Sequence, residues 1–211
     1  MKLKAIFFDI DGTLLDTREF IYQAFEHSLG AHGHQPFTRE ELRIVMGKTL
    51  EGGYQTLAQL DDVEDLMNTH RAFQAANMNL SIPYPHVAET LDALKKKGLK
   101  IAGITTRSRD SAKATLKLAG LMEYFEFFVG MDDVENPKPH PEPLERALKH
   151  FELRPDEAMM VGDSDVDIMA GKAAGTYTAG CAYGFHPNHI ADAEPDYLID
   201  DVKEILTIIS Q

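Results

Sequence analysis

Cysteine is scarce in this sequence of 211 residues, and tryptophan is absent. The single cysteine, Cys181, excludes a disulfide within the chain and favours a reducing compartment. Basic residues are also few, 21 against 34 acidic ones, which gives a formal net charge of −13. Because nucleic acids and anionic membranes are bound by basic surfaces, this balance disfavours both as partners.

Long apolar runs are missing as well, and none approaches the length of a membrane-spanning helix. The N-terminus enters strand-forming residues directly, without the pattern of a signal peptide. We therefore expect a cytoplasmic protein that does not contact membranes. Its composition, 44% hydrophobic and 26% charged, is typical of a globular protein with one well-filled core.

Apolar strand-like segments and amphipathic helical segments alternate along most of the chain. Strands are expected at residues 4–8, 99–104, 125–129, 158–161 and 176–179, and helices at 87–97, 110–119, 141–151, 165–174 and 202–209. Such alternation predicts a mainly parallel sheet covered by helices on both faces. The expected fold class is therefore α/β, with a Rossmann-like doubly wound core.

Residues 16–82 have a different pattern, in which apolar side chains recur at helical spacing and no strand is evident. The segment Pro83-Tyr84-Pro85 resists helix and marks the return to alternating elements. The sequence thus predicts a core domain of residues 1–15 and 83–211. An all-helical domain of about four helices, residues 16–82, is inserted into it.

Two aspartates follow the first strand in the segment Asp9-Ile10-Asp11-Gly12-Thr13. On an extended backbone Asp9 and Asp11 point to the same side, at the strand end where open α/β sheets bind ligands. Burying both carboxylates without a counter-charge would be very costly, so the pair implies a cation. A calcium-binding EF-hand is excluded, because Leu14 and Phe20 stand where that loop needs glycine and glutamate.

Polar residues follow other expected strands too. Thr105 and Thr106 follow the strand at 99–104, Lys138 lies between two prolines after the next strand, and Asp163 and Asp167 follow the strand at 158–161. Because parallel strands end at one edge of a sheet, these residues should converge on Asp9 and Asp11. Carboxylates, hydroxyls and a lysine together predict a magnesium-assisted phosphate site.

These stretches, taken together and in this order, resemble the phosphatases of the haloacid dehalogenase superfamily that carry a helical cap after the first strand. The resemblance covers essentially the whole chain. Within the superfamily the chain looks like the group of phosphoglycolate phosphatases, pyrophosphatases and β-phosphoglucomutases, and the segments Ile104-Thr105-Thr106 and Pro137-Lys138-Pro139 favour the first two.

The resemblance implies a role for each motif residue. Asp9 would attack phosphorus to form an aspartyl-phosphate, and Asp11 would protonate the leaving oxygen and later activate water. Lys138 would neutralise the transferring group and pair with Asp9. Substrate phosphate would be bound by Thr105, Thr106 and Gly12. Mg²⁺ would be held by Asp9, Asp163 and the backbone carbonyl of Asp11, with Asp167 a ligand through water or a residue that supports the ligands.

Three features refine what the resemblance implies. Asp11 favours phosphoryl transfer, because the true dehalogenases of the superfamily lack it. Thr106 stands where phosphoglycolate phosphatases usually carry asparagine, which weakens the assignment of a substrate. Lys48 and Arg71 in the inserted helices are candidates to hold an anionic group of the substrate. A solvated helix surface is the alternative, and the sequence does not decide between them.

The expected function is a magnesium-dependent phosphoric monoester hydrolase acting on a small phosphorylated metabolite such as phosphoglycolate, as a monomer or homodimer. An inorganic pyrophosphatase and a β-phosphoglucomutase-like phosphosugar mutase are the alternatives. A non-catalytic binding protein on the same scaffold is disfavoured, because it would be expected to have lost one of Asp9, Asp11, Lys138 or Asp163.

Overall fold

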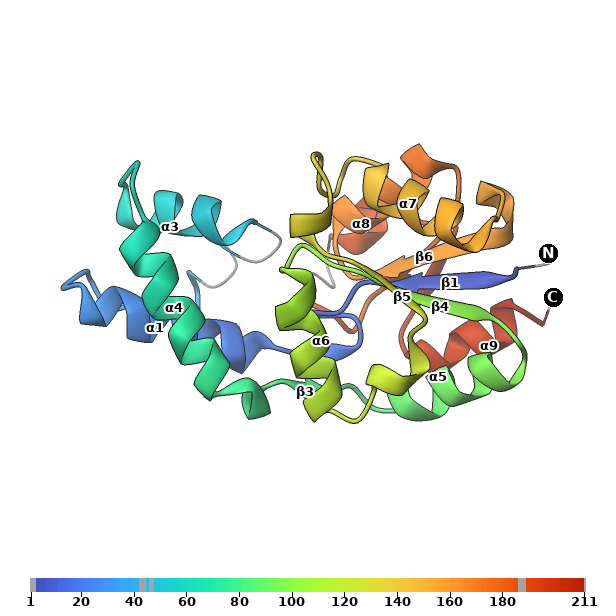
Figure 1. The fold of residues 1–211 in the computed structure, drawn as a ribbon, viewed down its shortest axis with the longest axis horizontal. Coiled ribbons are helices and arrows are strands. Elements are labelled where there is room, and N and C mark those ends of the chain that lie inside the picture. The colour runs from blue at the N-terminus through green and yellow to red at the C-terminus, as the bar shows by residue number, and fades with distance from the viewer. Residues whose placement is uncertain (1–2, 42–44, 46–47, 186–188, 211) are drawn as a thin grey trace. The chain divides into compact units, whose positions relative to one another are not determined.

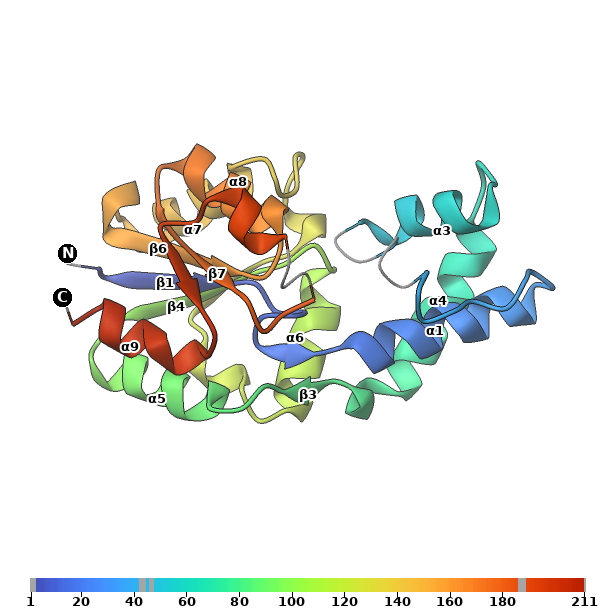
Figure 2. The same cartoon turned by 180° about the vertical axis from the view of Figure 1, so that it is seen from behind.

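The protein is described by a computed structural model that covers residues 3–41, 45, 48–185 and 189–210. The chain divides into two compact units. The core unit comprises Met1–Asp16 and Pro83–Gln211, and the helical unit comprises Thr17–Ile82. Figures 1 and 2 show the two units from opposite sides.

The core unit is built on one six-stranded sheet. Its strands are β1 (Ala5–Phe8), β4 (Lys100–Ile104), β5 (Phe127–Val129), β6 (Ala158–Gly162), β7 (Tyr177–Cys181) and β8 (Tyr197–Ile199). They lie in the order β5-β4-β1-β6-β7-β8, and every neighbouring pair is parallel. The expected α/β class with a doubly wound parallel sheet is confirmed.

Helices cover both faces of this sheet. They are α5 (Val87–Lys96), α6 (Arg109–Leu118), α7 (Glu142–Phe151), α8 (Asp165–Ala174) and α9 (Ile205–Ile208). Alternate residues of β1 enter different cores: Ile6 and Phe8 pack in the cluster with side chains of α5, α6 and α9, and Phe7 packs with α7 and α8. Figure 1 shows α7 and α8 on one side of the sheet and α5 and α9 on the other.

The structure differs from the predicted elements mainly near the C-terminus. Strand β8 was not expected from the sequence, because it has three residues and lies at the edge of the sheet, where periodicity is weak. The expected helix at 202–209 is a 3₁₀ turn, Val202–Glu204, followed by the short helix α9.

The described residues of the helical unit form α1 (Arg18–Ala31), α3 (Leu50–Ala58), α4 (Glu64–Ala76) and a 3₁₀ turn at Met78–Leu80. Their shared core includes Phe25, Tyr54 and Leu66. Of the apolar residues expected on a helix near position 45, Val45 is buried, whereas Leu42 and Met46 lie outside the described residues. The two-residue strands β2 (Leu15–Asp16) and β3 (Ile82–Pro83) pair where the chain passes between the units.

No helix among the described residues is long and apolar enough to cross a membrane.

Candidate active site

The ends of three neighbouring strands bring the main predicted residues together. Asp9 follows β1, Thr105 follows β4 and Asp163 follows β6, and these strands are adjacent in the sheet. Hydrogen bonding between β1 and β6 continues past the end of β1, since the Asp9 N–H donates to the Val161 carbonyl at 2.9 Å. The parallel sheet thus places residues more than 150 positions apart at one edge.

Gly12 shapes the turn after β1. Its φ of +88° lies in the left-handed region that favours glycine. A Cβ at this position would lie 2.3 Å from Asp163 Oδ2, closer than any non-bonded contact permits. The backbone of the turn therefore lies directly against the Asp163 carboxylate, and glycine is required there for both reasons.

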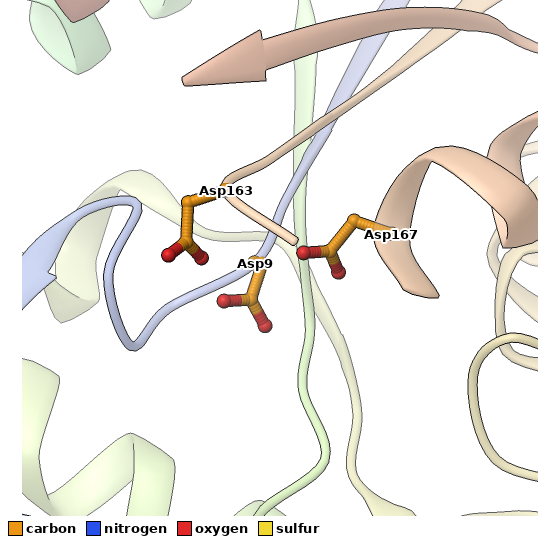
Figure 3. A group of neighbouring side chains, drawn as sticks. All are labelled: Asp9, Asp163 and Asp167. Carbon is orange, nitrogen blue, oxygen red and sulfur yellow. The ribbon is translucent and has the colours of Figure 1, made fainter. Parts of the chain in front are cut away.

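Three carboxylates converge in the buried interior of this edge. Asp9, Asp163 and Asp167 each offer an oxygen, and these oxygens all lie within 4.8 Å of one another. Figure 3 shows the three side chains beside one another, with Asp9 between the other two. All three residues are at most 6% exposed.

Lys138 is the cation that joins this group. Its Nζ donates to Asp9 Oδ1 at 2.8 Å, to Asp167 Oδ1 at 2.5 Å and to the Ile104 carbonyl at 2.9 Å. An ammonium group has three N–H donors, so all of them have acceptors within the protein. Lys138 is therefore fixed against Asp9 and Asp167 in a buried position.

The three buried carboxylates outnumber the one ammonium that bonds to them, and the pKa values of these groups are shifted. Burial raises the pKa of Asp9 to about 7, reinforced by Asp167 and Asp11 and opposed by Lys138. Burial, together with the charges of Asp9 and Asp167, raises the pKa of Asp163 well above its usual range. Burial alone would lower the pKa of Lys138, but the charges of Asp167 and Asp9 more than offset it.

These residues fit a hard divalent cation. When the three carboxylates are ionised, Lys138 balances one of the charges and two remain in a buried site. Carboxylate oxygens are the ligands that Mg²⁺ prefers. A divalent ion held by Asp9, Asp163 and Asp167 would supply the missing counter-charge.

Hydrogen bonds from neighbouring residues hold two of these carboxylates in place. The Phe185 N–H donates to Asp163 Oδ2 at 2.7 Å. Ser164 donates to Asp167 Oδ2 from its N–H at 3.1 Å and from its hydroxyl at 2.6 Å. Ser164 is the N-cap residue of α8, and Asp165 is exposed as the first helical residue.

Asp11 lies apart from the carboxylate group and pairs with Arg107. Arg107 Nη1 donates to Asp11 Oδ1 at 3.1 Å, and both side chains are about 15% exposed. Sequence reasoning did not single out Arg107. The available signal was a basic residue two positions after Thr105 at a strand end, but Arg109 in the same segment has a similar pattern, and the sequence does not tell them apart.

Thr105 is buried, and its hydroxyl oxygen accepts the Arg107 N–H at 3.1 Å. With this lone pair occupied, the hydroxyl hydrogen is directed elsewhere, which suits donation to a phosphate oxygen. Thr106 follows in a half-buried position. The structure thus places Thr105 and Thr106 at the same sheet edge as Asp9.

Lys48 and Arg71 lie in the helical unit. Lys48 is exposed, and its Nζ donates to Thr56 Oγ1 at 3.0 Å. Arg71 forms an exposed ion pair with Glu64 at 3.6 Å. Their expected role toward an anionic substrate stays a prediction, and Gly47, beside Lys48, lies outside the described residues.

A family model agrees with this architecture. The model of haloacid dehalogenase-like hydrolases matches residues 6–181, which include Asp9, Lys138, Asp163 and Asp167. The match thus spans the whole carboxylate group and the inserted helical unit.

Individual relatives match over nearly their full length. The pyrophosphatase PpaX of Anoxybacillus flavithermus is 36% identical over 99% of this chain and 98% of its own. Among solved structures, one described as a predicted phosphoglycolate phosphatase from Haemophilus somnus has a TM-score of 0.93 at 28% identity, covering 100% of this chain and 99% of its own. CbbY from Rhodobacter sphaeroides, solved in complex with phosphate, has a TM-score of 0.87 at 26% identity and covers 99% of this chain and 100% of its own.

Proposed function

This chain belongs to the haloacid dehalogenase-like hydrolase family, and we propose that it is a magnesium-dependent phosphatase that acts on a small phosphorylated metabolite through an aspartyl-phosphate intermediate. The observation that carries this proposal is the buried group of Asp9, Asp163 and Asp167, whose negative charge Lys138 balances only in part. Such a site suits a divalent cation and a phosphoryl group together.

In the proposed reaction Asp9 is the nucleophile. One of its carboxylate oxygens attacks phosphorus, and the bond from phosphorus to the leaving oxygen breaks. Lys138 holds Asp9 Oδ1 at 2.8 Å and so restricts the carboxylate to one orientation. A bound Mg²⁺ would neutralise charge on the transferring group and favour in-line geometry.

Asp11 completes the proposed cycle as acid and base. It gives a proton to the leaving oxygen in the first step and takes one from the attacking water in the second, which releases phosphate and restores Asp9. The Thr105 hydroxyl donates to a phosphate oxygen throughout. Lys48 and Arg71 stay candidates to hold an anionic group of the substrate.

Phosphoglycolate is the proposed type of substrate, and inorganic pyrophosphate is a second candidate. The second is favoured by one observation, the 36% identity over nearly the whole chain to a protein named as a pyrophosphatase. A phosphosugar mutase differs from both, because it would return the phosphoryl group to sugar and release no phosphate.

The test is phosphate release from a panel of substrates with Mg²⁺ and with EDTA. The panel contains phosphoglycolate, pyrophosphate, hexose phosphates, nucleoside monophosphates and an aryl phosphate. We expect magnesium-dependent release from phosphoglycolate or pyrophosphate well above the others. Hexose phosphate isomerisation without phosphate release would indicate the mutase, and absence of turnover on every compound would contradict the proposal.

A further inference from the structure

Arg107 links three parts of the site edge. Its Nη1 donates to Asp11 at 3.1 Å, and its backbone N–H donates to the Thr105 hydroxyl at 3.1 Å. Its Nη2 donates to Ser111 Oγ at 2.7 Å and to Thr115 Oγ1 at 2.9 Å on helix α6. The guanidinium is thereby held in a fixed orientation beside Asp11, with 16% of the side chain exposed.

The two cations of the site occupy different places. Lys138 is buried, and its three donors are taken by Asp9, Asp167 and the Ile104 carbonyl. Arg107 contacts Asp11 instead, the residue that lies outside the carboxylate group. Within the part of the chain that the structure describes, Arg107 is the cation that pairs with Asp11.

We propose that Arg107 is a specificity-determining residue that selects substrates whose leaving group carries a negative charge of its own. This inference rests on the proposed function, in which Asp11 faces the leaving oxygen. The negative charge of Asp11 would repel an anionic leaving group there. The Arg107 guanidinium, 3.1 Å from Asp11, offsets that charge and adds a positive charge that would attract an anionic leaving group.

The inference defines a substrate class. Phosphoglycolate, with a carboxylate on its leaving group, and pyrophosphate, whose leaving group is phosphate, both belong to it. Hexose phosphates have uncharged leaving groups and do not.

A purely structural role for Arg107 makes a different prediction. If the side chain only ties the segment after β4 to α6, its loss would disturb Thr105 and weaken turnover of every substrate alike. The recognition role weakens only substrates with a charged leaving group. A comparison of two substrates on one variant therefore separates the two roles.

The test uses Arg107→Gln, which keeps a donor toward α6 and removes the charge. Phosphoglycolate is compared with its uncharged carboxamide, and kcat/KM is measured for both. We expect the ratio of the two values to fall by about 10- to 100-fold in the variant, the effect of losing one charged hydrogen-bonding partner. Arg107→Lys, which keeps the charge without the planar fork, should lose less.

Arg109→Gln is the matched control. Arg109 lies two positions away and pairs with Asp133 at 2.7 Å, with 45% of its side chain exposed. This variant removes the same charge from the same segment and should leave the substrate ratio unchanged. If the ratio of the two kcat/KM values falls equally in Arg109→Gln, the effect comes from overall charge and the proposal is overturned.

Binding provides a readout that does not depend on turnover. Calorimetry compares methylenediphosphonate, which mimics an anionic leaving group, with methylphosphonate, both in the presence of Mg²⁺. We expect Arg107→Gln to weaken the binding of methylenediphosphonate by at least about 10-fold and the binding of methylphosphonate by less than about threefold. Circular dichroism confirms folding of each variant, and Arg107→Met, which also removes the charge, replaces Arg107→Gln if the latter does not fold.

The outcomes separate the two proposals. Equal weakening of both phosphonates, no weakening of either, or no binding by the wild-type protein overturns the role of Arg107. Selective weakening of methylenediphosphonate binding supports the role of Arg107 even when the wild-type protein hydrolyses none of the substrates in the panel. In that case only the proposed hydrolytic function fails.

Discussion

The core unit and the helical unit both bury polar side chains, but of different kinds. In the helical unit, the Tyr54 hydroxyl lies 2.8 Å from His70 Nδ1, and the Ser28 hydroxyl donates to the Leu66 carbonyl at 2.7 Å. These groups are surrounded by apolar side chains such as Phe25. In the core unit, the buried polar side chains include three carboxylates and one ammonium at the sheet edge.

The difference lies in charge: the helical unit buries these neutral hydroxyls, whereas the core unit buries carboxylates whose charges one ammonium balances only in part. In the helical unit the two hydroxyls have hydrogen-bonding partners within the unit, so their burial costs little. In the core unit the carboxylates outnumber the ammonium that bonds to them, and burial, reinforced by the neighbouring carboxylates, raises the pKa values of Asp9 and Asp163. Buried charges that are not balanced destabilise the protein unless a cation from outside the chain binds there.

The largest expected effect is on turnover in the core unit. Asp9→Asn removes the proposed nucleophile while keeping the side-chain shape, so phosphate release should fall by at least about 10³-fold. Circular dichroism should show an unchanged fold. Asp165→Asn is the matched control, because Asp165 is exposed at the start of α8, and it should keep near-normal rates. Near-normal rates in Asp9→Asn would instead overturn the assignment of the nucleophile.

Removing the buried ammonium should affect stability as well as turnover. Lys138→Met leaves Asp9 and Asp167 buried without their shared partner, and breaking a buried ion pair costs about 3–5 kcal/mol. Urea unfolding of the metal-free protein measures this loss. Lys149→Met, at an exposed position on α7, should change the free energy of unfolding by less than about 0.5 kcal/mol. Equal stability of the two variants would show that the buried charges need no partner.

Metal binding should stabilise the protein through the carboxylates and not through the helical unit. At a concentration of about 100 times its dissociation constant, Mg²⁺ should raise the free energy of unfolding by about 2.7 kcal/mol relative to EDTA. Asp167→Asn should abolish most of this increase, and Tyr54→Phe should retain it. The same increase in Asp167→Asn as in the wild-type protein would place the metal elsewhere.

The sequence predicted the parts of the site that depend on strand ends. Asp9, Thr105 and Asp163 follow buried strands, and the parallel sheet brings them together as expected. The sequence did not indicate which arginine pairs with Asp11, because that depends on the path of the backbone after β4. Nor did it show that the Ile104 carbonyl accepts from Lys138, since any backbone carbonyl near the lysine was an equal candidate.

In the helical unit, spacing predicted helices but not their polar contacts. Apolar residues such as Phe25 and Leu66 recur at helical intervals and are buried as expected. The pairing of Tyr54 with His70 joins α3 to α4 and depends on how these helices pack, which periodicity does not determine. Strand β8 was missed because three residues are too few to show a period.

The smallest expected effect concerns this tyrosine. Tyr54→Phe removes a buried hydroxyl and leaves the His70 ring without that partner, which should lower the free energy of unfolding by about 1 kcal/mol at neutral pH. The catalytic rate should stay within about twofold of the wild-type value, because the hydroxyl lies inside the core of the helical unit. A large loss of activity would show that this hydroxyl has a role in catalysis.

The effect of Tyr54 should also depend on pH in one direction. Burial raises the pKa of Tyr54 above its usual value of 10.0, so above that pH the unfolded chain loses a proton that the folded protein keeps. The folded state then binds more protons than the unfolded state, and the free energy of unfolding falls as pH rises. Replacement by phenylalanine removes this contribution, so the gap between wild type and Tyr54→Phe should narrow from pH 9 upward. Unfolding curves of both proteins at successive pH values test this, and a gap that widens would mean that the ionised phenolate is tolerated in the core.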